Sequence, residues 1–226
     1  MKVNVEYLAH SGYVVETDHH VMIFDYVDGN LPRHYLDNHK YTVFFVTHSH
    51  DDHYHPGIFK YKKDVIVSED VRIPIKEQAT IVRPFDSLIL NGIKVNVFGS
   101  TDLGVSYLVN SDGVSIFHAG DLNDWHWKEE STIDEIELAN FQFLNIIEDL
   151  KDHAVDIAMF PVDPRMRKDF DQGARTYIQT IRPTWFFPMH YADTRSIRSF
   201  EQWASKQKGT KIEIPFENNQ RFTCEV

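Results

Sequence analysis

The sequence predicts an α+β protein built as a four-layer αββα sandwich. Its first half consists of short β segments separated by turn residues, whereas its second half alternates strands with longer amphipathic helices. Two stacked sheets, each with helices on its outer face, fit both patterns because each sheet must cover its apolar surface. The 226 residues, 42% of them hydrophobic, include no linker-like stretch, so we expect one domain over residues 1–226.

The first half carries the turn-bounded β segments. Residues 43–46 (Val-Phe-Phe-Val) form a continuous apolar run, which is typical of a strand buried on both faces. Asn91-Gly92 is a strong hairpin signal between two further strands. The other strands predicted in this half span residues 3–8, 13–16, 21–24, 65–67, 87–90 and 93–98.

The second half interleaves helices with strands. Apolar residues recur with a helical period over residues 132–151, and shorter amphipathic helices follow near 170–181 and 197–204. Pro183 ends the second of these helices, because proline cannot continue a helix. The predicted strands of this half span residues 105–109, 114–117, 155–160, 184–187 and 211–214.

Charge and composition exclude several kinds of partner. The net charge of −11 would repel nucleic acid. The chain begins without the basic segment and apolar core of a signal peptide, and no apolar run approaches the roughly 20 residues of a membrane span. Its single cysteine, Cys224, cannot form an internal disulfide. We therefore expect a cytoplasmic protein that binds neither nucleic acid nor membrane.

Histidine is unusually frequent and clustered. The chain has thirteen histidines, and His48, His50, His53 and His55 lie close together immediately after the predicted buried strand. Imidazole and carboxylate groups are the protein ligands of zinc and related ions, and the segment 48–53 (His-Ser-His-Asp-Asp-His) supplies both. The sequence therefore predicts a metal site in this turn; a solvated histidine-rich loop is the alternative.

Two later polar residues occupy matching positions. Asp121 follows the strand predicted at 114–117, and His190 follows the strand predicted at 184–187. Ligands at strand ends converge on one edge of a sandwich, as ligand sites in α/β sheets commonly do. We expect both side chains to meet the histidine cluster.

The ordered motifs resemble those of the metallo-β-lactamase superfamily. The matching segments are His48-x-His50-x-Asp52-His53, Gly120-Asp121 and Pro188-Met189-His190. The opening Leu8-Ala9-His10-Ser11-Gly12-Tyr13, with Ile23-Phe24-Asp25, is similar to the branch that contains ascorbate-6-phosphate lactonase and related metal-dependent hydrolases.

The resemblance implies two neighbouring metal sites that share a carboxylate. The first site would use His48 and His50, the second would use Asp52, His53 and His190, and Asp121 would bridge them. It also implies that His10 lies near the site, behind the ligands.

The chain departs from the family pattern at one ligand of the first site. A third histidine normally stands between the early cluster and the bridging aspartate, but residues 99–104 (Gly-Ser-Thr-Asp-Leu-Gly) contain none. Asp102 is the expected substitute, and a carboxylate there would make the site more tolerant of manganese or iron. His118 is a second candidate, and a weak or unused first site is the third interpretation.

The resemblance implies a metal-dependent hydrolase of a small molecule. Zinc is the expected ion, as one or two ions, with Mn²⁺ or iron as alternatives. Coordination lowers the pKa of water from 15.7 to roughly 7, which would provide a hydroxide to attack a lactone, amide or phosphoester. Asp52 and Asp121 would orient it and accept its proton. The alternatives are a non-hydrolytic enzyme, such as an iron oxygenase or a thioester enzyme, and a metal-binding or sensing protein with reduced catalysis.

Three further residues are candidates for substrate contact. Trp125 lies in the segment 124–128 (Asp-Trp-His-Trp-Lys), just after Asp121, where indoles can form a pocket wall. Arg165 follows a predicted strand and can bind an anionic group bidentately. Tyr191, beside His190, is a candidate oxyanion donor. Ordinary loop packing and surface ion pairing are the alternatives for these residues.

Overall fold

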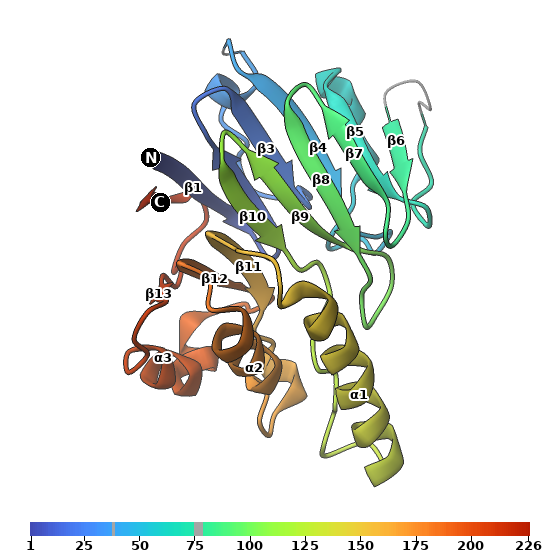
Figure 1. The fold of residues 1–226 in the computed structure, drawn as a ribbon, viewed down its shortest axis with the longest axis vertical. Coiled ribbons are helices and arrows are strands. Elements are labelled where there is room, and N and C mark those ends of the chain that lie inside the picture. Colours follow the sequence, from blue (N-terminus) through green and yellow to red (C-terminus); the bar gives the residue numbers. More distant parts are fainter. Residues whose placement is uncertain (38, 75–78) are drawn as a thin grey trace.

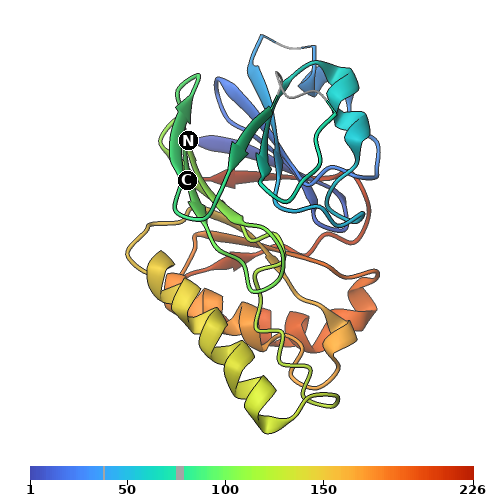
Figure 2. The same cartoon turned by 90° about the vertical axis from the view of Figure 1, so that its right-hand side faces the viewer.

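The computed structural model describes residues 1–37, 39–74 and 79–226, which form two sheets of seven strands each. The first sheet has the order β14-β1-β2-β3-β4-β5-β6, and the second has the order β13-β12-β11-β10-β9-β8-β7. The helices α1, α2 and α3 gather on the far side of the second sheet (Figures 1 and 2). The predicted α+β sandwich is confirmed.

The elements have the following bounds. The first sheet contains β1 (Lys2–Ala9), β2 (Gly12–Glu16), β3 (His20–Phe24), β4 (Tyr41–Val46), β5 (Asp64–Ser68), β6 (Ala79–Val82) and β14 (Gln220–Glu225). The second contains β7 (Ser87–Leu90), β8 (Ile93–Phe98), β9 (Ser106–Ser111), β10 (Val114–His118), β11 (Ile157–Pro161), β12 (Trp185–Met189) and β13 (Lys211–Ile212). The helices are α1 (Ile133–Leu150), α2 (Gln172–Ile181) and α3 (Arg198–Ala204).

The outer layers differ between the two sheets. The second sheet is covered by α1 to α3, whereas the short 3-10 helices Arg33–Tyr35 and Pro56–Tyr61 lie over the first. They bury Tyr35, Ile58 and Phe59 in an apolar cluster with residues of β3, β4 and β5. Every residue of β3 and all but the first of β4 are buried, as the apolar run at 43–46 predicts.

Helix α1 begins one residue after the predicted start and is capped by Thr132. Thr132 accepts a bond from the Glu135 N–H, and the Glu135 side chain accepts one from the Thr132 N–H, which together form a capping box. Phe143 and Ile147 are buried, whereas Ile133 is exposed because the first turns extend beyond the body of the molecule (Figure 1). None of the helices in the described part of the chain has the length and apolar character that a membrane crossing requires.

The C-terminal strand prediction is wrong in extent. The strand predicted at 211–214 forms only the two residues of β13, and the last strand is β14. β14 pairs antiparallel with β1, so that Lys2 lies opposite Glu225 and the two chain ends lie side by side (Figure 1). β6, an edge strand with exposed Ile81, was not predicted either. β14 is held by β1, which lies more than 200 residues away, whereas β6 is a four-residue strand with two exposed residues beside β5, so neither shows a clear local pattern.

Parallel strands bring the polar residues of the two sheets together. β3 and β4 pair in parallel, with Phe24 opposite Phe45, and β10, β11 and β12 are also parallel neighbours. Their carboxyl ends therefore lie along one edge, where ligand sites form in such sheets.

Candidate metal centre

The centre lies where β4 of the first sheet and β10 and β12 of the second sheet end. His48, His50, Asp52 and His53 occupy the turn after β4, Asp121 follows β10, and His190 follows β12. The side chains of His48, His53, Asp121 and His190 are buried, whereas those of His50 and Asp52 are about half exposed. The predicted convergence of distant strand ends is thus present.

Asp25 fixes the orientation of His53. It follows β3, is completely buried, and accepts bonds from the Thr47 N–H at 2.8 Å and the Thr47 hydroxyl at 2.7 Å. Its Oδ2 also lies 2.8 Å from His53 Nδ1. The Nδ1–H of His53 therefore points to Asp25, and Nε2 presents its lone pair to the site.

Thr47 links the same Asp25 carboxylate to the ring of His48. Its hydroxyl donates its only proton to Asp25, so the contact of 3.0 Å with His48 Nδ1 makes that nitrogen the donor. His48 Nε2 is left as an acceptor, 3.4 Å from Asp121 Oδ2. One buried carboxylate therefore sets the tautomers of two candidate ligands.

His190 is oriented from the second sheet. Its Nδ1 lies 3.0 Å from Asp163 Oδ2, and its Nε2 lies 3.0 Å from Asp121 Oδ1. Arg165 binds the same Asp163 carboxylate bidentately, which holds that carboxylate in place. Burial raises the pKa of Asp163, but bonds from His190 and Arg165 outweigh it and lower the pKa to about 2.

The donor atoms fit a divalent cation. His53 Nε2 and His190 Nε2 lie 3.2 Å apart, and Asp121 Oδ1 lies within 3.0 Å of both. With Nδ1 of each ring directed at a carboxylate, two lone pairs face an oxygen of Asp121 that is buried and has no hydrogen-bond partner among the described residues. Three acceptors converging in this way require a positive charge between them, and imidazole and carboxylate are zinc ligands.

A second group of donors adjoins the first. His50, Asp102 and Asp121 have ligand atoms within 4.8 Å of one another. Asp102 reaches this position because Thr101, its neighbour, donates to the Asn123 carbonyl and accepts from the Asn123 N–H, which ties the two loops together. The placement fits Asp102 as the substitute for the missing histidine.

His118 does not face the ligands. Its Nε2 donates to the Ser11 carbonyl at 2.9 Å, and its Nδ1 accepts from the Gly120 N–H at 3.1 Å. The ring also stacks on Phe24. Because both of its nitrogens are hydrogen-bonded, His118 stabilises the loop that carries Asp121 and is not available as a metal ligand.

His10 lies closer to the ligands than its predicted place behind them. Its Nε2 is 3.2 Å from Asp52 Oδ2, and its ring lies 4.1 Å from that of His190, centroid to centroid. His10, Asp52, His53 and His190 form one group with ligand atoms within 4.8 Å of one another. The bond from His10 is the main reason that the pKa of Asp52 lies well below its usual range.

Protein stripped of metal with a chelator should lose stability as the pH rises. Burial lowers the pKa of His53, but Asp25 and Asp121 outweigh it and raise the pKa from 6.5 to about 10. The raised pKa contributes stability that is complete below pH 6.5 and is lost as the pH rises through about 10. Urea unfolding in EDTA across this range should show a decline that His53→Gln lacks. A decline of equal size in both proteins would contradict this assignment.

Gly104 closes the loop that carries Asp102 against the histidine turn. Its φ is +77°, and a Cβ there would lie 2.1 Å from the Thr47 carbonyl oxygen and 2.5 Å from His48 Cβ. Gly113 has a similar φ of +81° with nothing within 4 Å, so Gly113→Ala is a matched control.

Gly104→Ala should therefore destabilise the protein more than Gly113→Ala does. Both variants carry the strain of a left-handed alanine, about 1–2 kcal/mol. Only Gly104→Ala adds a steric clash, which we expect to lower the free energy of unfolding by a further ~1–3 kcal/mol. Urea denaturation measures both, and equal losses would contradict a tight approach at Gly104.

A cavity of about 320 Å³ opens onto the candidate ligands. The residues that line it are His50, Asp52, Thr101, Asp102, Asp121, Trp125, Trp127, Arg165 and His190. The structure therefore places Trp125 and Arg165 in the lining of this cavity, and their contact with a substrate stays a prediction.

Tyr191 does not fit its predicted role. It is buried, and its hydroxyl donates its only proton to the Pro215 carbonyl at 2.6 Å. A phenol committed in this way cannot stabilise an oxyanion at the metal centre, so that prediction is wrong. Sequence reasoning also gave no role to Thr47, although its position directly between a buried strand and the histidine cluster is a usable signal.

Comparisons with known proteins identify sequences similar to this chain. A family model described as the beta-lactamase superfamily domain matches residues 4–138. A UPF0173 metal-dependent hydrolase from Thermococcus kodakarensis is 23% identical over 231 residues, which cover 94% of this chain and 95% of that protein.

Solved structures share the fold at low sequence identity. Igni18, a novel metallo hydrolase from Ignicoccus hospitalis, aligns over 100% of both chains with a TM-score of 0.72 and 18% identity. CmlA, a diiron β-hydroxylase from Streptomyces venezuelae, gives a TM-score of 0.65 and 12% identity over 99% of this chain and 54% of CmlA.

Proposed function

The chain belongs to the metallo-β-lactamase superfamily, and from that premise we propose that it is a metal-dependent hydrolase of a small molecule. The bond cleaved would be a lactone, amide or phosphoester. The similarity to a UPF0173 metal-dependent hydrolase supports hydrolysis, and the cavity of about 320 Å³ suits a small substrate. Membership of the branch that contains ascorbate-6-phosphate lactonase stays a prediction.

The convergence on Asp121 is the observation that carries this proposal. Its Oδ1 lies 2.9 Å from His53 Nε2 and 3.0 Å from His190 Nε2, and its Oδ2 lies 3.4 Å from His48 Nε2. The shared carboxylate supports a site for two neighbouring ions, with His50 and Asp102 on its exposed side. Zinc is the proposed ion, since imidazole is the dominant donor, with Mn²⁺ or iron as alternatives.

The chain's own residues would prepare the reaction. When bound, a divalent ion supplies a nucleophile near neutral pH by lowering the pKa of water and polarises the bond under attack. Asp52 stays ionised because His10 lowers its pKa, so it can accept a hydrogen bond from the attacking water and orient it. Its low pKa makes it a weak proton acceptor. His10, which is kept uncharged mainly by burial, adjoins it.

Metal analysis followed by reconstitution tests the proposal. Purified protein should contain zinc by mass spectrometry, and EDTA should abolish turnover of a panel of simple lactones, amides and phosphoesters. Re-addition of zinc should restore it. Metal bound without turnover of any member of the panel would contradict a hydrolase.

An iron oxygenase is the second candidate. The similarity to CmlA and the carboxylate Asp102 beside His50 and Asp121 favour it, because a carboxylate-rich site suits iron better than zinc. Predominant iron, with oxygen consumption and no hydrolysis, would support this alternative over the first. A metal-binding protein with reduced catalysis would bind the ion but would show neither hydrolysis nor oxygen consumption.

A further inference from the structure

We propose that the substrate carries an apolar ring, which packs against Trp125 and Trp127 while its reacting group lies at the metal centre. This inference rests on the proposed function, since it specifies the substrate of that same site. It adds a binding surface, which we call the indole wall and define as Trp125 and Trp127. The wall would recognise an apolar ring face, whether aromatic or saturated.

The indole wall adjoins the candidate ligands directly. The two rings are nearly parallel, with an interplanar angle of 13° and centroids 6.1 Å apart. Trp125 meets His190 edge to face at 6.0 Å, and its Nε1–H donates to the Asp121 carbonyl at 2.7 Å. Both tryptophans are only partly buried and line the cavity that contains Asp121 and His190. A ring on the wall would thus lie beside the candidate ligands in the same cavity.

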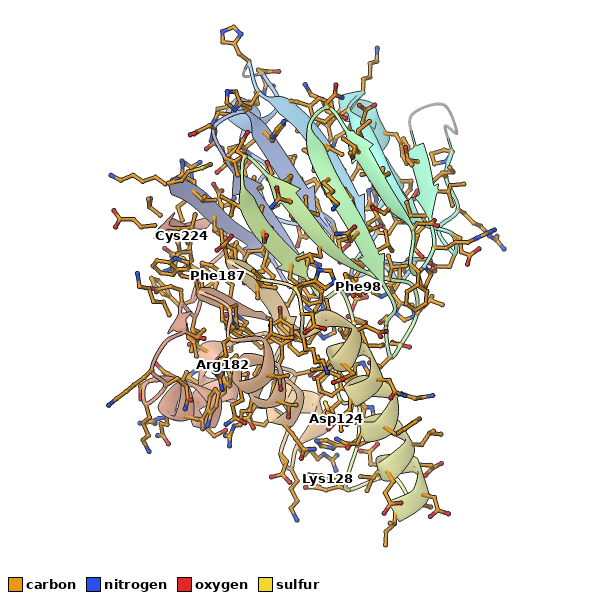
Figure 3. All side chains as sticks on the ribbon, viewed as in Figure 1. Phe98, Asp124, Lys128, Arg182, Phe187 and Cys224 are labelled. Atoms are coloured by element: carbon orange, nitrogen blue, oxygen red, sulfur yellow. The ribbon has the colours of Figure 1, made fainter. Side chains whose placement is uncertain are left out.

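Alternate residues of the segment anchor the wall. Asp124 accepts bonds from Asn140 of α1 at 3.1 Å and from Gln172 of α2 at 2.8 Å. Lys128 donates to Gln172 at 2.6 Å and to Asp169 at 2.7 Å. Figure 3 shows Asp124 and Lys128 beside α1, at the helical end of the molecule.

The middle residue of the segment, His126, is also anchored. It is buried, and its Nε2 donates to the Asp169 carbonyl at 3.1 Å. The three polar residues of the segment are therefore fixed to the helical layer, while the two indoles between them line the cavity. Because the anchors lie on both sides of each indole, the wall is rigid before any substrate arrives.

Backbone strain marks the same place. Trp127 has a φ of +37°, which a bulky side chain rarely adopts and which persists only where the surroundings impose it. Together with the anchors this conformation presents two indole faces in a fixed orientation, which lowers the entropy lost when a ring binds.

The other residues that line the cavity are mostly charged or polar, in contrast to the indole wall. Asp52, Asp102, Asp121 and Arg165 line it with charged groups, so the indoles supply the only large apolar surface among its described lining residues. A polar substrate would gain little there, whereas an apolar ring face would exclude water from both indoles. The volume of about 320 Å³ admits one ring with a short reactive group.

Calorimetric titration of the zinc-loaded protein with product-like acids tests the inference. The probes are benzoate, cyclohexanecarboxylate and acetate, which share a carboxylate and differ in the ring. Benzoate should bind about tenfold or more tightly than acetate, and Trp127→Ala should reduce that ratio by about threefold to tenfold. Trp203→Phe, which alters a tryptophan on α3 outside this cavity, should leave the ratio unchanged. Because the readout is a ratio of two affinities, a general loss of zinc or of folded protein does not imitate it.

The outcomes separate this inference from the proposed function. Equal affinities for the three acids, no binding of any of them, or a preference that survives in Trp127→Ala would overturn the indole wall. Cyclohexanecarboxylate matching benzoate would support recognition of any apolar ring, and weak binding of it would restrict the ring to aromatic ones. A ring preference in a protein without hydrolytic turnover would leave the wall standing and remove the hydrolase.

Discussion

Asp121→Asn is expected to remove most of the bound metal and to reduce hydrolysis by more than about 100-fold. Loss of a residue that only supports a ligand typically lowers metal affinity or activity by about 10–100-fold, so loss of a shared ligand should exceed that range. Asp121 is the carboxylate that contacts His48 on one side and His53 and His190 on the other. Asparagine keeps the shape but removes the charge. Metal content by mass spectrometry and turnover of the most active substrate of the panel measure the effect.

Asp112→Asn is the matched control for this substitution. Asp112 also pairs with histidines, His19 at 2.9 Å and His20 at 3.4 Å, but it lies before β10, whereas Asp121 follows it. The Asp112→Asn protein should keep its metal and its activity. If Asp121→Asn behaved like this control, the proposed metal centre would be wrong.

Asp25→Ala is expected to lower the free energy of unfolding by about 3–5 kcal/mol in protein stripped of metal. Removing one partner of a buried charge pair leaves the other uncompensated, and here it also leaves the Thr47 N–H and hydroxyl without their acceptor. Burial raises the pKa of Asp25, but His53 and His118 hold it below its ordinary value. The stability that Asp25 contributes through its lowered pKa is therefore fully present above the ordinary pKa of aspartate. It is lost as the pH falls through the lowered pKa of Asp25. Urea unfolding near neutral pH measures the loss.

Two further variants separate stability from metal binding. Asp25→Asn keeps an acceptor for Thr47 but removes the charge, and we expect it to weaken zinc affinity by about 10–100-fold. Asp51→Ala removes an exposed aspartate from the same turn as His53 and should change stability by no more than ~0.5 kcal/mol. A loss for Asp25→Ala as small as that of Asp51→Ala would show that the buried network contributes little.

The fold was largely predictable because its strands are apolar runs ended by turn residues. The hairpin strands β7 and β8 have the predicted bounds, since Asn91-Gly92 fixes the turn between them. Helix α1 lies within one residue of the predicted bounds at each end because its apolar residues recur with a helical period. β14 was missed because its pairing with β1 depends on residues more than 200 positions away, which no local pattern encodes. The single-domain organisation and the cytoplasmic location stay predictions.

The candidate ligands were predictable as a set, but their environment was not. The motif and two strand ends suffice to predict that Asp121 and His190 meet the turn after β4. The direction of a side-chain hydroxyl could not be predicted in the same way. The hydroxyl of Tyr191 donates to Pro215, a residue 24 positions away in the sequence. Likewise, the division of residues 124–128 into anchors and indoles depends on α1 and α2, which follow that segment in the chain.

The pairing of β1 with β14 has a consequence for synthesis. β1 leaves the ribosome before its antiparallel partner, residues 220–225, which emerges more than 200 residues later. At about 5–20 residues per second, one edge of β1 stays unpaired for at least ~10 s. The long-range contact that completes the sheet therefore leaves one edge of β1 open to strand pairing until synthesis has reached residues 220–225.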